Sequence, residues 1–143
     1  MKVHIRRVDK DLPLPEYKTP GAAAMDLSAR EGAVIQPHSI EVIPLNVSLK
    51  PPQGHFTLMA ARSSLRKRGL MLANNVGILD EDYAGDGDEY LAALYNFTDS
   101  PVPVERGDRL VQIIVLPYDK VTWQEVETLN SPDRGGMGTT GIQ

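Results

Sequence analysis

The chain has 143 residues, 41% of them hydrophobic, which is enough for one domain with one core and too little for two. A formal net charge of −4 argues against nucleic-acid binding through a basic surface, and the absence of cysteine excludes disulfides, thiolate metal sites and cysteine nucleophiles. The charged N-terminus is unlike a signal peptide, and no run approaches the roughly 20 apolar residues that cross a bilayer. We therefore expect a cytoplasmic protein with neither nucleic acid nor membrane as a partner.

Short apolar runs rich in Val, Ile, Leu and Tyr, separated by Pro, Gly, Asp and Asn, are typical of an all-β domain. The predicted strands cover residues 34–35, 40–49, 56–60, 90–96, 110–116 and 121–126. Eleven prolines and twelve glycines favour turns over helices.

Two of these strands have informative patterns. Leu45, Val47 and Leu49 alternate with Asn46 and Ser48, which predicts one buried and one polar face. Residues 113–116 are apolar on both faces, so this strand should be central or lie between the core and another subunit.

One short helix is predicted over residues 65–68, with Ser63 or Ser64 as its N-cap and Gly69 as its C-terminal stop. Free backbone N–H groups at its start, the two hydroxyls and the preceding Arg62 form a candidate phosphate site. A capped surface turn with solvated basic side chains is the alternative.

The stretch NNVGILDEDY, residues 74–83, carries the strongest chemical signal. It suits a hairpin pocket that reads a polar ring with an asparagine and backbone groups, covers it with an aromatic ring, and holds a carboxylate able to take a proton from water. A calcium loop is excluded, because Ala84 replaces an oxygen ligand and Leu91 occupies the closing position.

The C-terminal SPDRGGMGTTGIQ is too rich in glycine to be a packed strand. Residues 136–141 match a dinucleotide-binding fingerprint formally, but with two residues left no helix can follow. We expect a β-domain over residues 1–130 and a mobile arm over residues 131–143 that closes over an anion, with a disordered tail as the alternative.

Taken in order, PGAAAMDLSA, RSSLRKRGL, NNVGILDEDYAG, GDRLVQIIVLP and RGGMGTTG resemble the five motifs of the trimeric dUTP diphosphatases, the dUTPases. The resemblance runs from about residue 20 to residue 141, nearly the whole chain. It implies a homotrimer of distorted β-barrels or jelly rolls that hydrolyses dUTP to dUMP and pyrophosphate with Mg²⁺. Such an enzyme keeps uracil out of DNA and supplies dUMP for thymidylate synthesis.

The resemblance also implies a role for each motif residue. Asp80 resembles the carboxylate that orients and deprotonates the attacking water. Asp26 resembles the acid that holds the water shell of the metal, an ion kept mainly by the substrate phosphates. The residues that match phosphate-binding positions are Arg62, Ser63, Ser64, Gln112, Arg134, Thr139 and Thr140.

The base and sugar would be read by a second set. Asn74 matches the uracil-reading amide, with Asn75 as a possible substitute and backbone groups around Gly77 assisting. Tyr83 resembles the aromatic that packs under the deoxyribose and leaves no room for a 2′-hydroxyl. Met137 stands where the family usually has a phenylalanine stacked on uracil.

Two alternatives to an active dUTPase follow from the same resemblance. The length of RSSLRKRG and the added residues 86–89 depart from the commonest dUTPase pattern, and the former is shared with the related dCTP deaminases. The glutamate that deamination requires falls at Ala93 and the usual helix arginine at Lys67, which disfavours deamination. A nucleotide-binding sensor is the other alternative, although the intact set of polar motif residues favours activity.

Overall fold

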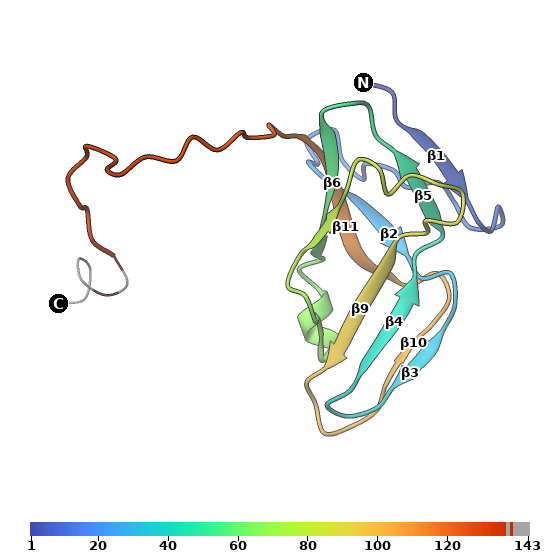
Figure 1. Ribbon diagram of the computed structural model, residues 1–143. Helices are drawn as coiled ribbons and strands as arrows, with labels where there is room; N and C mark the ends of the chain where they lie inside the picture. Colours follow the sequence, from blue (N-terminus) through green and yellow to red (C-terminus); the bar gives the residue numbers. More distant parts are fainter. Residues whose placement is uncertain (137, 139–143) are drawn as a thin grey trace.

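The computed structural model describes residues 1–136 and 138, and its regular elements there are almost entirely β-strands (Figure 1). The strands are β1 (His4–Arg7), β2 (Met25–Ser28), β3 (Ala33–Ile35), β4 (Ile40–Pro44), β5 (Val47–Lys50), β6 (His55–Ala61), β7 (Leu70–Leu72), β8 (Gly77–Leu79), β9 (Leu91–Asn96), β10 (Val102–Val104) and β11 (Arg109–Pro117). One turn of 3₁₀-helix, η1 (Leu65–Arg68), joins β6 to β7. The all-β prediction is confirmed. No helix in this part of the chain is long and apolar enough to span a membrane.

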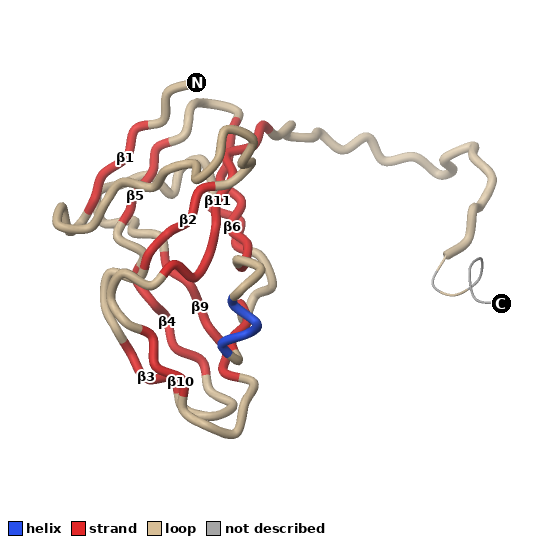
Figure 2. Tube along the Cα trace, turned by 180° about the vertical axis from the view of Figure 1, so that it is seen from behind, coloured by secondary structure: helices blue, strands red, loops and turns tan. Residues whose placement is uncertain are grey.

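The strands form four antiparallel sheets around one core, with β11 central in the largest. That sheet has the order β2-β11-β6-β8, and β4-β9-β7 form the second; the pairs β1-β5 and β10-β3 complete the fold (Figure 2). The inner faces bury mainly leucine, isoleucine and valine, together with Tyr90, whose hydroxyl donates a hydrogen bond of 2.8 Å to Thr57. β11 pairs with β6 along residues 111–117 but with β2 only as far as Ile113, so the prediction that residues 113–116 form a central strand holds at Ile113, while residues 114–116 are half-buried and have a neighbouring strand on one side only.

The predicted strand over residues 40–49 is interrupted at Asn46, which has a φ of 73°. Asparagine tolerates this left-handed conformation better than most residues, so the chain turns between β4 and β5. The predicted polar face is wrong, since Asn46 and Ser48 are only 3% and 5% exposed. The side-chain amide of Asn46 accepts a hydrogen bond from the backbone N–H of Asp9 and donates one to the carbonyl of Asp9. The hydroxyl of Ser48 donates to the carbonyl of Asp86 at 3.5 Å, so loops cover this face of the strand.

The added residues 86–89 are tied to the core through Glu89. Its carboxylate accepts hydrogen bonds from Arg30 at 2.7 and 2.8 Å and from the backbone N–H of Asn46 at 2.8 Å. Burial alone would raise the pKa of Glu89, but these donors more than offset it and lower the pKa below its usual value. These hydrogen bonds therefore anchor residues 86–89 to the β-domain.

The predicted strand over residues 121–126 is wrong. β11 ends at Pro117, and residues 119–135 are exposed and outside any strand. Figure 1 shows this segment running away from the β-domain. No strand among the described residues pairs with this segment, and Trp123 is 88% exposed.

Candidate active site

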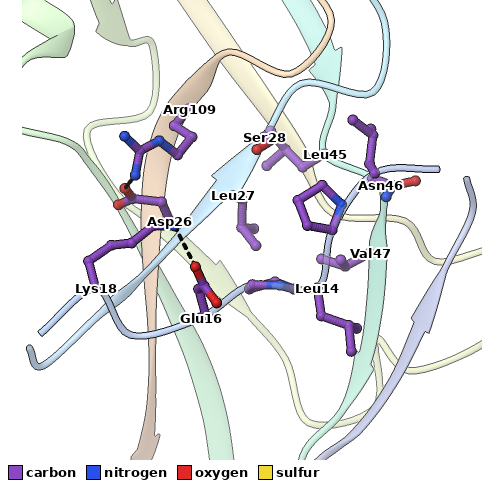
Figure 3. Close-up of a pocket in the computed structure, with 13 residues that line it drawn as sticks. Leu14, Glu16, Lys18, Asp26, Leu27, Ser28, Leu45, Asn46, Val47 and Arg109 are labelled. Atoms are coloured by element: carbon purple, nitrogen blue, oxygen red, sulfur yellow. Dashed lines mark hydrogen bonds and ion pairs between the residues drawn. The ribbon is translucent and has the colours of Figure 1, made fainter. Parts of the chain in front are cut away.

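Asp26 lies on β2, level with Gln112 on the neighbouring β11. Its Oδ2 atom meets the Nε of Arg62 at 3.0 Å and an Nη of Arg109 at 3.1 Å. Figure 3 shows the side chains of Asp26 and Arg109 directed at one another. Two guanidinium groups on one carboxylate leave a net positive charge, and their planar donors suit the oxygens of a phosphate.

The register of the sheet brings this cluster together. Arg62 follows β6 directly, and its N–H continues the ladder to the carbonyl of Leu110 at 3.3 Å. The side-chain amide of Gln112 donates to the carbonyl of Ala61 at 3.0 Å. Sequence reasoning missed Arg109, although it stands in the GDRLVQ motif, because that motif drew attention only to its glutamine.

The two serines lie beside Arg62 at the start of η1. Ser64 occupies the N-cap position, but its side chain makes no capping hydrogen bond. Within residues 1–136 and 138, neither serine hydroxyl has a hydrogen-bond partner. The predicted helix bounds and the Gly69 stop are confirmed, with Gly69 at a φ of 82°, while the element is a 3₁₀-turn. Both hydroxyls are therefore available to an anion held by Arg62.

A cavity of about 60 Å³ lies behind Asp26 and Arg109, lined largely by apolar side chains (Figure 3). Sites for small-molecule ligands are typically 300–1,000 Å³, so this cavity is too small for a nucleotide.

Asp80 follows β8 and begins a turn. The N–H of Tyr83 donates a hydrogen bond of 3.1 Å to the carbonyl of Asp80 and closes this turn. Its carboxylate is exposed and has no hydrogen-bond partner among the described residues. An open cavity of about 810 Å³ adjoins it, with Lys50, Tyr118 and Lys120 among its other lining residues. This volume is within the range of nucleotide-sized ligands.

Tyr83 is half-buried and firmly held. Its hydroxyl donates to the carbonyl of Glu89 at 2.8 Å, and its ring stacks on Tyr90 with centroids 6.3 Å apart. Burial, followed by the charges of Asp88 and Glu89, raises the pKa of Tyr83. The hydroxyl of Tyr83 is thus already hydrogen-bonded within the protein, so the ring is the part of this side chain that a ligand would contact.

The prediction of a hairpin around Asn74 and Asn75 is wrong, because the strands on either side of them do not pair with each other. Asn74 and Asn75 lie between β7 and β8, which belong to different sheets. Asn75 has a φ of 63°, and both side chains are exposed. Gly77 packs tightly on β6, where an added Cβ would lie 3.1 Å from the Cβ of Met59.

Asp80 and the Asp26 cluster lie at opposite ends of the largest sheet. Leu79 pairs with Thr57, whereas Ala60 pairs with Gln112 and Gln112 with Asp26. With about 3.3 Å per residue and about 4.8 Å between strands, the two aspartates are roughly 20 Å apart. One chain therefore does not bring the expected water-activating carboxylate to the expected phosphate site.

The arm residues are also apart from both groups. Arg134 is exposed, and its Nε donates to the carbonyl of Gly135 at 3.1 Å. Met137, Thr139 and Thr140 lie outside the described residues.

Comparisons with known proteins agree on one family. The dUTPase family model matches residues 10–141. The deoxyuridine 5′-triphosphate nucleotidohydrolase of Dictyoglomus turgidum is 40% identical, with 99% of each chain covered, and that of Corynebacterium glutamicum is 37% identical, with 97% of this chain and 94% of the relative covered. The chain belongs to the dUTPase family.

Solved structures show the same fold. The dUTPase of Streptococcus mutans superposes with a TM-score of 0.76 at 31% identity, covering 83% of this chain and 98% of that one. The dUTPase of Staphylococcus bacteriophage 80alpha with dUpNHpp reaches a TM-score of 0.86 over 99% of both chains, and at 20% identity it supports the fold alone.

Proposed function

We propose that the protein hydrolyses dUTP to dUMP and pyrophosphate at sites built from more than one copy of the chain. Membership of the dUTPase family, with full-length relatives up to 40% identical, supports the reaction. The main support for a shared site is the separation of roughly 20 Å between Asp80 and Asp26 within one chain. Both residues must face the same triphosphate, so the two would come from different chains.

A homotrimer, as the motif resemblance implies, provides these shared sites. The exposed segment that leads to the arm supports it, since Val121, Trp123 and Leu129 are apolar and have no cover in their own chain within the described residues. Arg134 lies 16 residues beyond Tyr118, so an extended arm reaches up to roughly 55 Å. A β-domain of this size has a radius of gyration of about 13 Å, so the arm is long enough to extend past its own domain to a neighbouring chain.

The phosphate chain would lie against Arg62, Arg109, Ser63, Ser64 and Gln112, with Arg134, Thr139 and Thr140 of an arm completing the enclosure. Asp80 of another chain would take a proton from the water that attacks the α-phosphorus. Among residues 1–136 and 138, no three carboxylate or imidazole groups gather as a metal cage. This fits Mg²⁺, which keeps several waters and binds phosphates plus one or two carboxylates, and the second oxygen of Asp26 is open to those waters. When bound, Mg²⁺ neutralises charge on the phosphate oxygens.

The nucleoside would lie along the segment from Asn74 to Tyr83. Asn74 or Asn75 and backbone groups near Gly77 would read uracil, and Met137 of the arm would cover its face. The ring of Tyr83, fixed by Tyr90 and Glu89, would fill the space that a 2′-hydroxyl needs.

The test is pyrophosphate release by the purified protein from dUTP, UTP and dCTP, with Mg²⁺ and with a chelator. We expect rapid release from dUTP, release from UTP and dCTP lower by about 10²-fold or more, and loss of activity on chelation. Deamination of dCTP is not expected, because Ala93, where that reaction needs a glutamate, offers only a methyl group on β9. Ammonia release from dCTP without pyrophosphate release from dUTP would overturn the assignment.

A further inference from the structure

Three segments of the chain meet at the Asp80 end of the largest sheet, and Glu81 joins them. Its Oε2 accepts hydrogen bonds from the hydroxyl of Tyr118 at 2.5 Å and from the N–H of Gly54 at 3.2 Å. The N–H of Tyr118 in turn donates to the carbonyl of Gly54 at 3.0 Å. We call Glu81, Tyr118 and Gly54 the Glu81 clamp.

The clamp spans three adjacent strands. Glu81 follows β8, Gly54 precedes β6, and Tyr118 follows β11, with β6 between the other two. The side chains of Glu81 and Tyr118 together therefore bridge about two strand spacings, roughly 10 Å, and meet over the start of β6.

Local packing fixes the partners of Glu81. The ring of Tyr118 stands edge-on to Phe56, with centroids 5.9 Å apart. Gly54 has a φ of 80°, a left-handed conformation that glycine adopts without strain and that directs its N–H at the carboxylate. The hydrogen bond from Tyr118 is the main cause that lowers the pKa of Glu81, so the contact is charge-assisted at neutral pH.

Asp80 lies next to this clamp in the chain. Its carboxylate has no partner among the described residues, so its backbone alone sets its place. The backbone is held on one side by the pairing of Leu79 with Thr57 and on the other by Glu81, and the carbonyl of Asp80 accepts the N–H of Tyr83 at 3.1 Å. A displacement of about 1 Å in a reacting group can cost about 10²-fold in rate.

We propose that Glu81 and Tyr118 are positioning residues that hold the Asp80 turn against the ends of β6 and β11 in the geometry that water activation needs. The inference rests on the proposed role of Asp80 as the base. It assigns a function to a tyrosine at the root of the arm, where the motif resemblance assigns none.

The variants are Tyr118→Phe, Glu81→Ala and Glu81→Gln in the full-length protein. Tyr118→Phe removes one oxygen and keeps the ring against Phe56, while Glu81→Gln keeps a carbonyl oxygen that can accept both hydrogen bonds. Tyr95→Phe is the matched control, because within the described part of the chain the hydroxyl of Tyr95 has one hydrogen-bond partner, His38, at 3.4 Å on the surface. The readouts are kcat and KM for dUTP, affinity for the non-hydrolysable analogue dUpNHpp, and the melting temperature.

We expect Tyr118→Phe and Glu81→Ala to lower kcat by about 10-fold, with affinity for dUpNHpp within about twofold of wild type, and Glu81→Gln and Tyr95→Phe to retain kcat within about twofold. In an Asp80→Asn background, Tyr118→Phe should have no further effect, because there is no base left to position.

Unchanged kcat in both Tyr118→Phe and Glu81→Ala would overturn the inference. So would a 10-fold loss that persists in the Asp80→Asn background, or a loss of dUpNHpp affinity, which would place the effect on the arm. Full activity of Asp80→Asn itself would instead contradict the proposed base, so the two failures are distinguishable.

Discussion

Asp80→Asn should lower turnover of dUTP by about 10²–10⁴-fold, the usual contribution of a positioned general base. The asparagine retains the shape of the side chain but cannot accept the proton from water. Because the carboxylate of Asp80 is exposed and makes no hydrogen bond within the described chain, the melting temperature and the affinity for dUpNHpp should be unchanged. Steady-state pyrophosphate release, calorimetry and analogue binding measure these three quantities.

Asp99→Asn is the matched control for this substitution. It removes an exposed carboxylate that pairs only with His38, at 2.8 Å, and should leave turnover as in the wild type. Turnover of Asp80→Asn within a few-fold of wild type would show that another group activates the water.

Arg134→Ala should lower kcat by up to about 10³-fold. An arginine that meets the transferring phosphoryl group contributes about 10³–10⁵-fold in other enzymes, and here it would act two phosphates away from the attacked atom, which places the effect at or below the lower end. Removal of residues 131–143 should have at least the same effect and leave the oligomeric state unchanged, because β11 ends well before, at Pro117.

Glu127→Ala is the control in the exposed segment just before the arm, since it alters an exposed charge without an expected ligand contact. The protease sensitivity of the wild-type arm should also fall when dUpNHpp and Mg²⁺ are added. Wild-type turnover by the truncated protein would show that the arm takes no part in catalysis.

The longer strands could be predicted from the sequence, and among the short ones β3 was predicted at residues 34–35, while β4 and β5 were predicted as one strand over residues 40–49. Strands β6, β9 and β11 agree with prediction to within one or two residues at each end, because each carries a run of six or more residues with few breaks. Strands β1, β2, β7, β8 and β10 have three or four residues, too few for a period of two to stand out. The turn at Asn46 was missed because alternation of apolar and polar residues does not report backbone conformation.

The residues of the candidate site could be predicted from the sequence, but the contacts between them could not. Motif resemblance selected Asp26, Arg62 and Gln112, and the register of β2, β11 and β6 places them together. Resemblance gave no sign that Arg109 shares the carboxylate of Asp26, nor that Glu81 binds Tyr118 across a strand. These contacts depend on which strands become neighbours, and strand order is a tertiary property.

Mixing two inactive variants tests the shared site most directly. Asp80→Asn and Arg62→Ala chains, each inactive alone, would be dissociated together, reassembled in equal amounts and assayed for dUTP hydrolysis, with the trimeric mass confirmed before and after. If Asp80 and Arg62 of one site come from different chains, random mixing restores both residues in about a quarter of the sites, and about a quarter of wild-type activity should return. No recovery, with mixed trimers demonstrated by mass, would show that each chain builds its own site and would contradict the account.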